Sequence, residues 1–256
     1  MKLHFRALGD GPPLIILHGL LGSLDNWVPV AQQLAVHFHV WLPDLRNHGR
    51  SPHAEAFSYD AMAGDVRRFM TDQRIEAAHL LGHSMGAKVA MRFAQLHPDA
   101  VRRLVVVDMS PREYPPRYDT LLDAMHALDL SGFQRRDEAD LALKEIVPDK
   151  SVRQFLLKNL GRDAAGRLFW KPNLPSIRGN YRDVRGALPM TAGVDRPTLF
   201  IRGEQSDYIQ AGDVPLIHQL FPRATFKTIA GTGHWVHADA PDRLVGVVAQ
   251  FLLAEM

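Results

Sequence analysis

Short, almost entirely apolar runs alternate with helical patterns over most of this chain. Strands buried on both faces of a parallel sheet have this composition, because helices cover both faces and neither side of the strand meets water. Strands that alternate with helices predict an α/β fold: a mostly parallel central sheet flanked by helices. The runs are residues 14–17, 40–42, 79–81, 104–107, 198–201 and 226–229, and residues 2–7 alternate as an antiparallel edge strand does.

Three stretches between or after these runs carry apolar residues at helical spacing. Ser58 is a typical N-cap before the first stretch, Pro98 helps to stop the second, and Pro241 suits the first turn of the third. We expect each stretch to form a helix that buries one face. The expected faces are Met62, Val66, Phe69 and Met70; Val89, Ala90, Phe93 and Leu96; and Leu244, Val247, Val248 and Phe251.

The alternation stops between about residues 111 and 188, where we predict no strand. A structureless loop of that length is unusual inside a domain, so the segment should have its own structure. Residues 1–110 and 187–256 are expected to form the α/β core, and residues 111–186 a helical cap inserted into it. Helical spacing continues there at Leu121, Leu122, Met125 and Leu128, then at Leu141 and Ile146, then at Val152, Phe155 and Leu156.

The sharpest motif is Gly82-His83-Ser84-Met85-Gly86, a G-x-S-x-G between a predicted strand and a predicted helix. A serine on such a tight turn is exposed to a substrate, and only small residues fit two positions before and after it. The start of the helix also points backbone N–H groups at the reacting centre. This context predicts that Ser84 is a nucleophile.

A serine hydroxyl needs a base, and His234 is the candidate. It follows two glycines in Gly231-Thr232-Gly233-His234, in the loop after the last strand, and it comes late enough to complete the order serine, acid, histidine. His237 lies three residues further on, but no carboxylate or third histidine has ligand spacing with this pair, so we predict no metal site.

Two aspartates could orient His234. Asp108 ends the run 104–107, and Asp207 follows the run 198–201. Both lie between Ser84 and His234 in sequence, and both follow carboxyl ends of strands, where α/β sheets build their sites. Spacing alone leaves both open.

His18-Gly19-Leu20-Leu21-Gly22 follows the first predicted parallel strand. It resembles the loop that contributes one backbone N–H to an oxyanion hole. Leu20 would supply that donor, and Met85, directly after the nucleophile, would supply the second.

Composition narrows the class of protein. The 256 residues include 30 Lys and Arg against 28 Asp and Glu, interleaved rather than clustered, so no nucleic-acid partner is expected. The absence of cysteine excludes disulfides and thiolate chemistry. No apolar run approaches the roughly 18 residues of a membrane span, and the N-terminus lacks the apolar region of a signal peptide. We expect a cytoplasmic protein, monomeric or a small homo-oligomer.

Taken together, these motifs resemble the α/β-hydrolase family along nearly the whole chain. The resemblance also covers Asp44-Leu45-Arg46-Asn47-His48-Gly49-Arg50-Ser51, a loop that is largely structural in the family. Residues 18–27, 107–111 and 233–238 are similar to those of the ybfF-type bacterial esterases, which carry a helical cap. The common family position for the acid holds Ser206 here, and Asp207 is one residue late. The resemblance therefore implies that Asp108 is the acid, with Asp207 as the alternative and Ser206 as an accessory hydrogen-bonding group.

The resemblance implies a serine carboxylesterase without a cofactor, acting on a small-molecule ester or thioester with a short to medium acyl chain. A thioesterase and other α/β-hydrolase chemistry, such as C–C bond hydrolysis or perhydrolysis, would keep the same residues. A module that binds a small apolar ligand is the non-enzymatic alternative. The cap would roof the acyl pocket. Its arginines are expected to aid solubility or to recognise an anionic group, and its larger apolar residues mainly to form its core. The arginines include Arg178 and Arg182, and the apolar residues Met125, Phe133, Phe155, Phe169, Trp170 and Tyr181.

Overall fold

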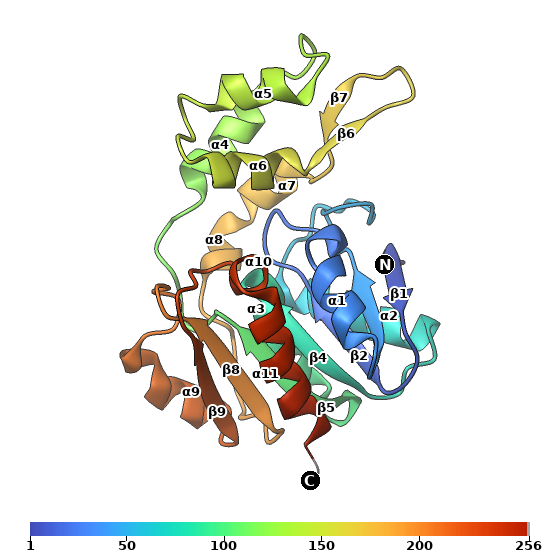
Figure 1. Ribbon diagram of the computed structural model, residues 1–256, viewed down its shortest axis with the longest axis vertical. Coiled ribbons are helices and arrows are strands. Elements are labelled where there is room, and N and C mark those ends of the chain that lie inside the picture. The colour runs from blue at the N-terminus through green and yellow to red at the C-terminus, as the bar shows by residue number, and fades with distance from the viewer. Residues whose placement is uncertain (255–256) are drawn as a thin grey trace.

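A seven-stranded sheet forms the centre of the protein, in a computed structural model that describes residues 1–254 (Figure 1). Its strand order is β1-β3-β2-β4-β5-β8-β9, and every pairing is parallel except that of β1 with β3. The strands are β1 (Phe5–Leu8), β2 (Pro13–Leu17), β3 (His39–Pro43), β4 (Ala78–His83), β5 (Val101–Val107), β8 (Thr198–Gly203) and β9 (Ala224–Ile229). All six predicted runs lie within these strands, and the edge strand is antiparallel as expected but begins three residues later than predicted.

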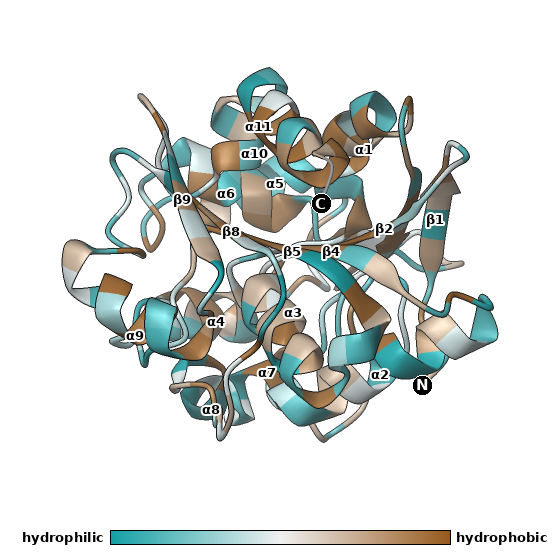
Figure 2. Cartoon of the chain, turned by 90° about the horizontal axis from the view of Figure 1, so that it is seen from below, coloured by the Kyte–Doolittle hydropathy of each residue, from teal (hydrophilic) through white to brown (hydrophobic). Residues whose placement is uncertain are grey.

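Helices cover both faces of the sheet (Figure 2). Neighbouring strand residues point into different apolar clusters: Ile15 packs into the cluster under α2 and α3, while Leu14 and Ile16 pack under α1 and α11. This two-sided burial explains why the strands read as continuous apolar runs. The core helices are α1 (Val28–Leu34), α2 (Tyr59–Asp72), α3 (Met85–Leu96), α9 (Val214–Leu220), α10 (Val236–Asp239) and α11 (Pro241–Leu253), with short 3-10 turns η1 (Leu24–Asn26), η2 (Pro98–Ala100) and η3 (Ala211–Asp213).

The predicted helices are present, with corrections to their buried faces. Ser58 caps α2, accepting a hydrogen bond from Ala61 N–H, and the expected face of α2 is buried. Leu96 was wrongly expected inside: it is the last residue of α3 and is 43% exposed. In α11, Val247 and Phe251 pack only partly against the core. Within residues 1–254 no helix combines the length and apolar character needed to cross a bilayer.

Between β5 and β8 the chain leaves the sheet and builds the inserted segment, residues 111–186, at one end of the molecule (Figure 1). It contains α4 (Asp119–Ala127), α5 (Arg136–Leu143), α6 (Lys150–Leu157), β6 (Leu160–Arg162), β7 (Leu168–Trp170), α7 (Leu174–Gly179) and α8 (Tyr181–Arg185). The division into a core and a cap at these boundaries stays a prediction.

The prediction that no strand lies in the inserted segment was wrong, because β6 and β7 pair as an antiparallel hairpin. Each strand has three residues, too few to show an alternating pattern. The turn is held by Asp163, whose carboxylate accepts the N–H groups of Ala165 and Arg167. Leu141 and Ile146 are also corrected: they are 69% and 49% exposed, since α5 buries Ala139 and Leu143 instead.

Lys88 connects both ends of the inserted segment to the core. Its side chain is fully buried, and Nζ donates to the carbonyl oxygens of Arg112, where the chain leaves, and Gly186, where it returns, at 2.7 and 2.5 Å. Burial together with the charge of Arg112 lowers the pKa of Lys88 to about 7, although the charge of Glu113 acts in the opposite direction. The rings of Tyr59 and Tyr114 complete its surroundings.

The lowered pKa of Lys88 predicts a pH-dependent contribution to stability. Below pH 7 both folded and unfolded chains hold the proton; above that, up to the ordinary pKa of 10.5, the unfolded chain binds more protons. The free energy of unfolding therefore rises with pH in this window. We expect the difference in unfolding free energy between wild type and Lys88→Met to increase from pH 6.5 to pH 9 in denaturant titrations.

Lys144 is an exposed lysine of the inserted segment, so Lys144→Met is the matched control and should leave the pH dependence as in wild type. An unchanged difference between wild type and Lys88→Met at the two pH values would contradict this account of Lys88.

Candidate active site

Ser84 occupies a strained turn between β4 and α3. Its φ of 53° and ψ of −122° are unfavourable for a residue with a side chain. Two glycines make the turn possible: a Cβ on Gly82 would lie 2.3 Å from the carbonyl oxygen of Gly86, and one on Gly86 would lie 2.3 Å from that of Leu17. Ser84 N–H donates to the Val107 carbonyl oxygen at 3.1 Å, which ties the turn to the end of β5.

The structure brings Asp108 and His234 into direct contact. His234 Nδ1 lies 2.7 Å from Asp108 Oδ2, and the Asp108 side chain is fully buried. Gly203 N–H donates to Asp108 Oδ1, and the Ser206 hydroxyl donates to Oδ2. With Nδ1 engaged in this way, Nε2 is the atom of the ring left free to act on a neighbouring group.

Ser84 and His234 line the same pocket. No hydrogen bond joins Ser84 Oγ to His234 Nε2 among residues 1–254, and the buried Nε2 has no other partner there. Such bonds are often long before substrate binds. Nε2 is thus placed at the pocket, free to receive a proton.

Two loops hold His234 in place. Gly231 N–H donates to the Glu204 carboxylate, and Gln205 N–H donates to the Thr232 carbonyl oxygen, so the loop after β9 is joined to the loop after β8. The loops approach so closely that a Cβ on Gly203 would lie 2.2 Å from the Gly233 carbonyl oxygen. Sequence analysis did not identify Gly203, the last residue of β8, as part of this site.

Asp207 lies apart from His234. Its side chain is 59% exposed and accepts two hydrogen bonds from Arg117, at 2.7 and 2.6 Å. These bonds, with the charge of Arg117, lower the pKa of Asp207. Asp108, Ser206 and His234 therefore lie together, whereas Asp207 forms an ion pair with Arg117 of the inserted segment.

Two buried histidines, His83 and His237, lie beside His234; the sequence showed His237 near it only as a possible metal ligand and gave His83 no role beside it. Burial lowers the pKa of His83 well below its ordinary value and that of His237 to about 3, with the charge of His234 adding to both shifts. His83 Nε2 contacts the carbonyl oxygen of His234 at 2.9 Å. These neighbours are neutral at physiological pH. In the described part of the chain, no three histidine or acidic side chains gather as a metal site would require.

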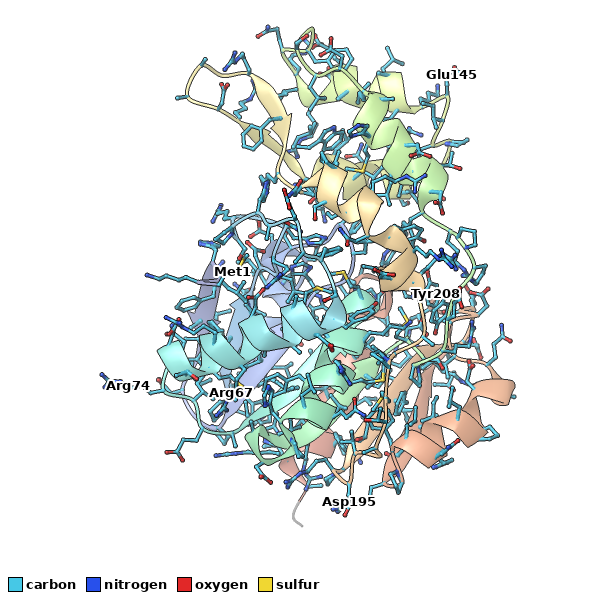
Figure 3. The ribbon with its side chains drawn as sticks, turned by 180° about the vertical axis from the view of Figure 1, so that it is seen from behind. Met1, Arg67, Arg74, Glu145, Asp195 and Tyr208 are labelled. Carbon is cyan, nitrogen blue, oxygen red and sulfur yellow. The ribbon has the colours of Figure 1, made fainter. Side chains whose placement is uncertain are left out.

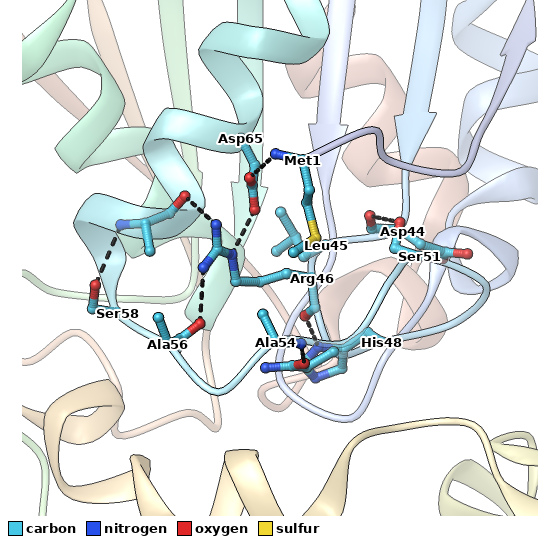
Figure 4. A network of polar contacts seen from close by, with 12 residues as sticks. Met1, Asp44, Leu45, Arg46, His48, Ser51, Ala54, Ala56, Ser58 and Asp65 are labelled. Atoms are coloured by element: carbon cyan, nitrogen blue, oxygen red, sulfur yellow. Dashed lines mark hydrogen bonds and ion pairs between the residues drawn. The ribbon is translucent and has the colours of Figure 1, made fainter.

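The loop with Leu20 is shaped by the loop of residues 44–51. Leu21 N–H donates to His48 Nε2 at 3.1 Å, and Leu24 N–H donates to Asp44 Oδ1 at 2.8 Å. Figure 4 shows the second loop held in turn by Arg46, which donates to the Asp65 carboxylate and to the Ala56 and Ala61 carbonyl oxygens. These contacts fit the expected structural role of residues 44–51.

Leu20 and Met85 lie beside Ser84 in a second pocket. Gly19 permits this proximity, because a Cβ there would lie 3.2 Å from the Ser84 Cβ. Within residues 1–254, neither the Leu20 nor the Met85 N–H has a hydrogen-bond acceptor. Both donors are thus free at the pocket that Ser84 lines.

This second pocket is small and is walled by aromatic rings. All five tyrosines of the chain line it, three of them from the inserted segment: Tyr59, Tyr114, Tyr118, Tyr181 and Tyr208. Phe155 lines the pocket on the His234 side. Of the other apolar residues expected in the cap core, Met125 is buried, Phe133 and Trp170 pack partly, and Phe169 is 44% exposed. Arg178 pairs with Asp119 and Asp123, away from this pocket.

Comparisons with known proteins agree with this architecture. A profile described as the alpha/beta hydrolase fold matches residues 12–241. The sn-1-specific diacylglycerol lipase ABHD11 of Danio rerio is 38% identical over 97% of this chain and 80% of its own. Esterase YbfF of Escherichia coli is 34% identical over 98% of this chain and 99% of its own. A solved structure of a marine microorganism esterase superposes with a TM-score of 0.96, at 41% identity, over 98% of this chain and 99% of its own. With one profile spanning most of its length and such relatives along nearly all of it, the chain belongs to the α/β-hydrolase family and is of the YbfF type.

Proposed function

We propose that the protein is a serine carboxylesterase that forms an acyl-enzyme on Ser84. The observation that carries the proposal is the 2.7 Å contact between buried Asp108 and His234 Nδ1, with His234 and Ser84 lining one pocket. A base oriented by a buried carboxylate, beside a serine on a strained turn, is the arrangement that activates a hydroxyl. Relatives named as esterases and lipases support hydrolysis of ester bonds.

In the proposed reaction, Ser84 Oγ attacks the ester carbonyl carbon while His234 Nε2 takes its proton. Asp108 holds the imidazole in the tautomer with hydrogen on Nδ1 and stabilises the charge that the ring then carries. The Leu20 and Met85 N–H groups donate to the oxygen that becomes negative. His234 returns the proton to the leaving alcohol, and water repeats the steps on the acyl-enzyme to release the acid.

The two pockets that meet at Ser84 suit the two halves of an ester. The pocket walled by tyrosines would hold the acyl group, and the one with Phe155 and Trp235 would hold the leaving group. Apolar walls and limited volume favour short to medium acyl chains. A series of p-nitrophenyl acyl esters and acyl thioesters would test this, because the relative kcat/KM values separate an esterase from a thioesterase.

Replacing Ser84 by Ala removes the proposed nucleophile while keeping the turn. Hydrolysis of p-nitrophenyl esters should fall by on the order of 10⁴-fold or more. A fluorophosphonate probe should label wild type and not the variant, as measured by intact mass. Activity retained in Ser84→Ala would remove the central claim, and wild type that neither turns over esters nor takes the label would favour a binding module.

Asp108→Asn should cost far more activity than Asp207→Asn. An amide in place of the Asp108 carboxylate favours the wrong imidazole tautomer, so kcat should fall by on the order of 10³- to 10⁴-fold. Asp207→Asn only weakens an exposed ion pair, and its effect should stay below about tenfold. Thermal unfolding of both variants checks that they fold, and the reverse ranking would transfer the role of acid to Asp207.

A further inference from the structure

The Tyr208 ring lies flat against His234. The two ring centroids are 3.6 Å apart, and the ring planes differ by 13°. The Asp108 bond fixes only Nδ1, about which the imidazole could still turn. A ring packed on one face removes that freedom. The other aromatic neighbour, His83, is 4.8 Å away at 39° and does not stack.

Tyr208 is itself anchored to the acid. Its N–H donates to Ser206 Oγ at 3.3 Å, the same hydroxyl that donates to Asp108. Its carbonyl oxygen accepts the Tyr114 hydroxyl at 2.7 Å, and the side chain is buried at 7% exposure. The stacking ring and the carboxylate are thus held by one short loop.

Arg117 covers the opposite face of this ring. Its Cζ lies 4.7 Å from the Tyr208 centroid, and because His234 occupies one face, the guanidinium must occupy the other. The two hydrogen bonds to Asp207 keep the guanidinium in that orientation. Arg117 belongs to the inserted segment, and Figure 3 labels Tyr208 at the level where that segment meets the core.

We propose that Tyr208 is a positioning residue that fixes the plane of the His234 ring, and that Arg117 of the inserted segment, held by Asp207 of the core, packs Tyr208 into place. The proposal rests on His234 being the base of the proposed function. It gives Asp207, which does not touch His234, a role in the same site. The electron-rich face of Tyr208 also attracts the positive charge that His234 carries after taking the Ser84 proton.

The first test separates ring stacking from pocket lining. Tyr208→Leu should lower kcat for p-nitrophenyl butyrate by roughly 10- to 100-fold, the cost of a misplaced catalytic group, with KM changed much less. Tyr208→Phe keeps the ring and should restore kcat to within about threefold of wild type. Tyr59 lines the same pocket without stacking on His234, so Tyr59→Leu is the matched control and should act mainly on KM.

The second test measures the coupling through Arg117. Arg117→Leu should lower kcat by about tenfold in wild type and have no further effect in Tyr208→Leu, because the ring that Arg117 packs against is gone. Arg178→Leu removes a comparable ion pair of the inserted segment that does not touch Tyr208, and it should leave kcat unchanged.

Three results would overturn the proposal: equal losses in Tyr208→Phe and Tyr208→Leu, a Tyr208→Leu effect confined to KM, or additive effects of Arg117→Leu and Tyr208→Leu. If Tyr208→Leu does not fold, Tyr208→Phe and Arg117→Leu still test the proposal. A kcat in Arg117→Leu equal to that of wild type would refute the role of the contact between Arg117 and Tyr208. Ester hydrolysis that survives Ser84→Ala would instead refute the proposed function.

Discussion

The close approach of backbones at the carboxyl end of β4 is the constraint on which the rest of the site depends. Gly86 lies so near the Leu17 carbonyl that no side chain fits between helix α3 and strand β2. This contact lets the helix start directly at the sheet and forces Ser84 into its strained turn. Because β2, β4, β5 and β8 are neighbouring parallel strands, the loops after them open at one edge, and Leu20, Ser84, Asp108 and Ser206 reach that edge from four separate strands.

Most of the core could be predicted from the sequence, because strands buried on both faces of the sheet appear as short, continuous apolar runs. The G-x-S-x-G turn could be predicted too, because the tight local geometry of the turn itself requires its glycines. Contacts between distant residues could not. The pairing of Asp207 with Arg117 joins positions 90 apart, and nothing in the local pattern distinguishes Asp207 from Asp108. The β6–β7 hairpin escaped for a different reason: a strand of three residues is shorter than the pattern that identifies one.

The histidines around His234 are buried and uncharged. His83 and His237 have low pKa values because the interior penalises a positive ring, so the only ionic contact of His234 is with Asp108 in the described part of the chain. A low-dielectric shell strengthens that single interaction, since fewer charges and less water screen it. The neutral histidines thus give the site a well-defined electrostatic axis, from Asp108 through the imidazole toward Ser84.

The attachment of the inserted segment has a consequence for how such proteins diversify. The segment leaves after β5 and returns before β8, two strands that lie side by side, so its two ends need not reorganise the sheet. Lys88 grips those ends through backbone carbonyl oxygens, which every amino acid possesses. In a chimaera that carries the inserted segment of a relative, Lys88 could donate the same two hydrogen bonds whatever the side chains at the ends of that segment. The anchor therefore places no demand on the side chains at the two ends of the segment.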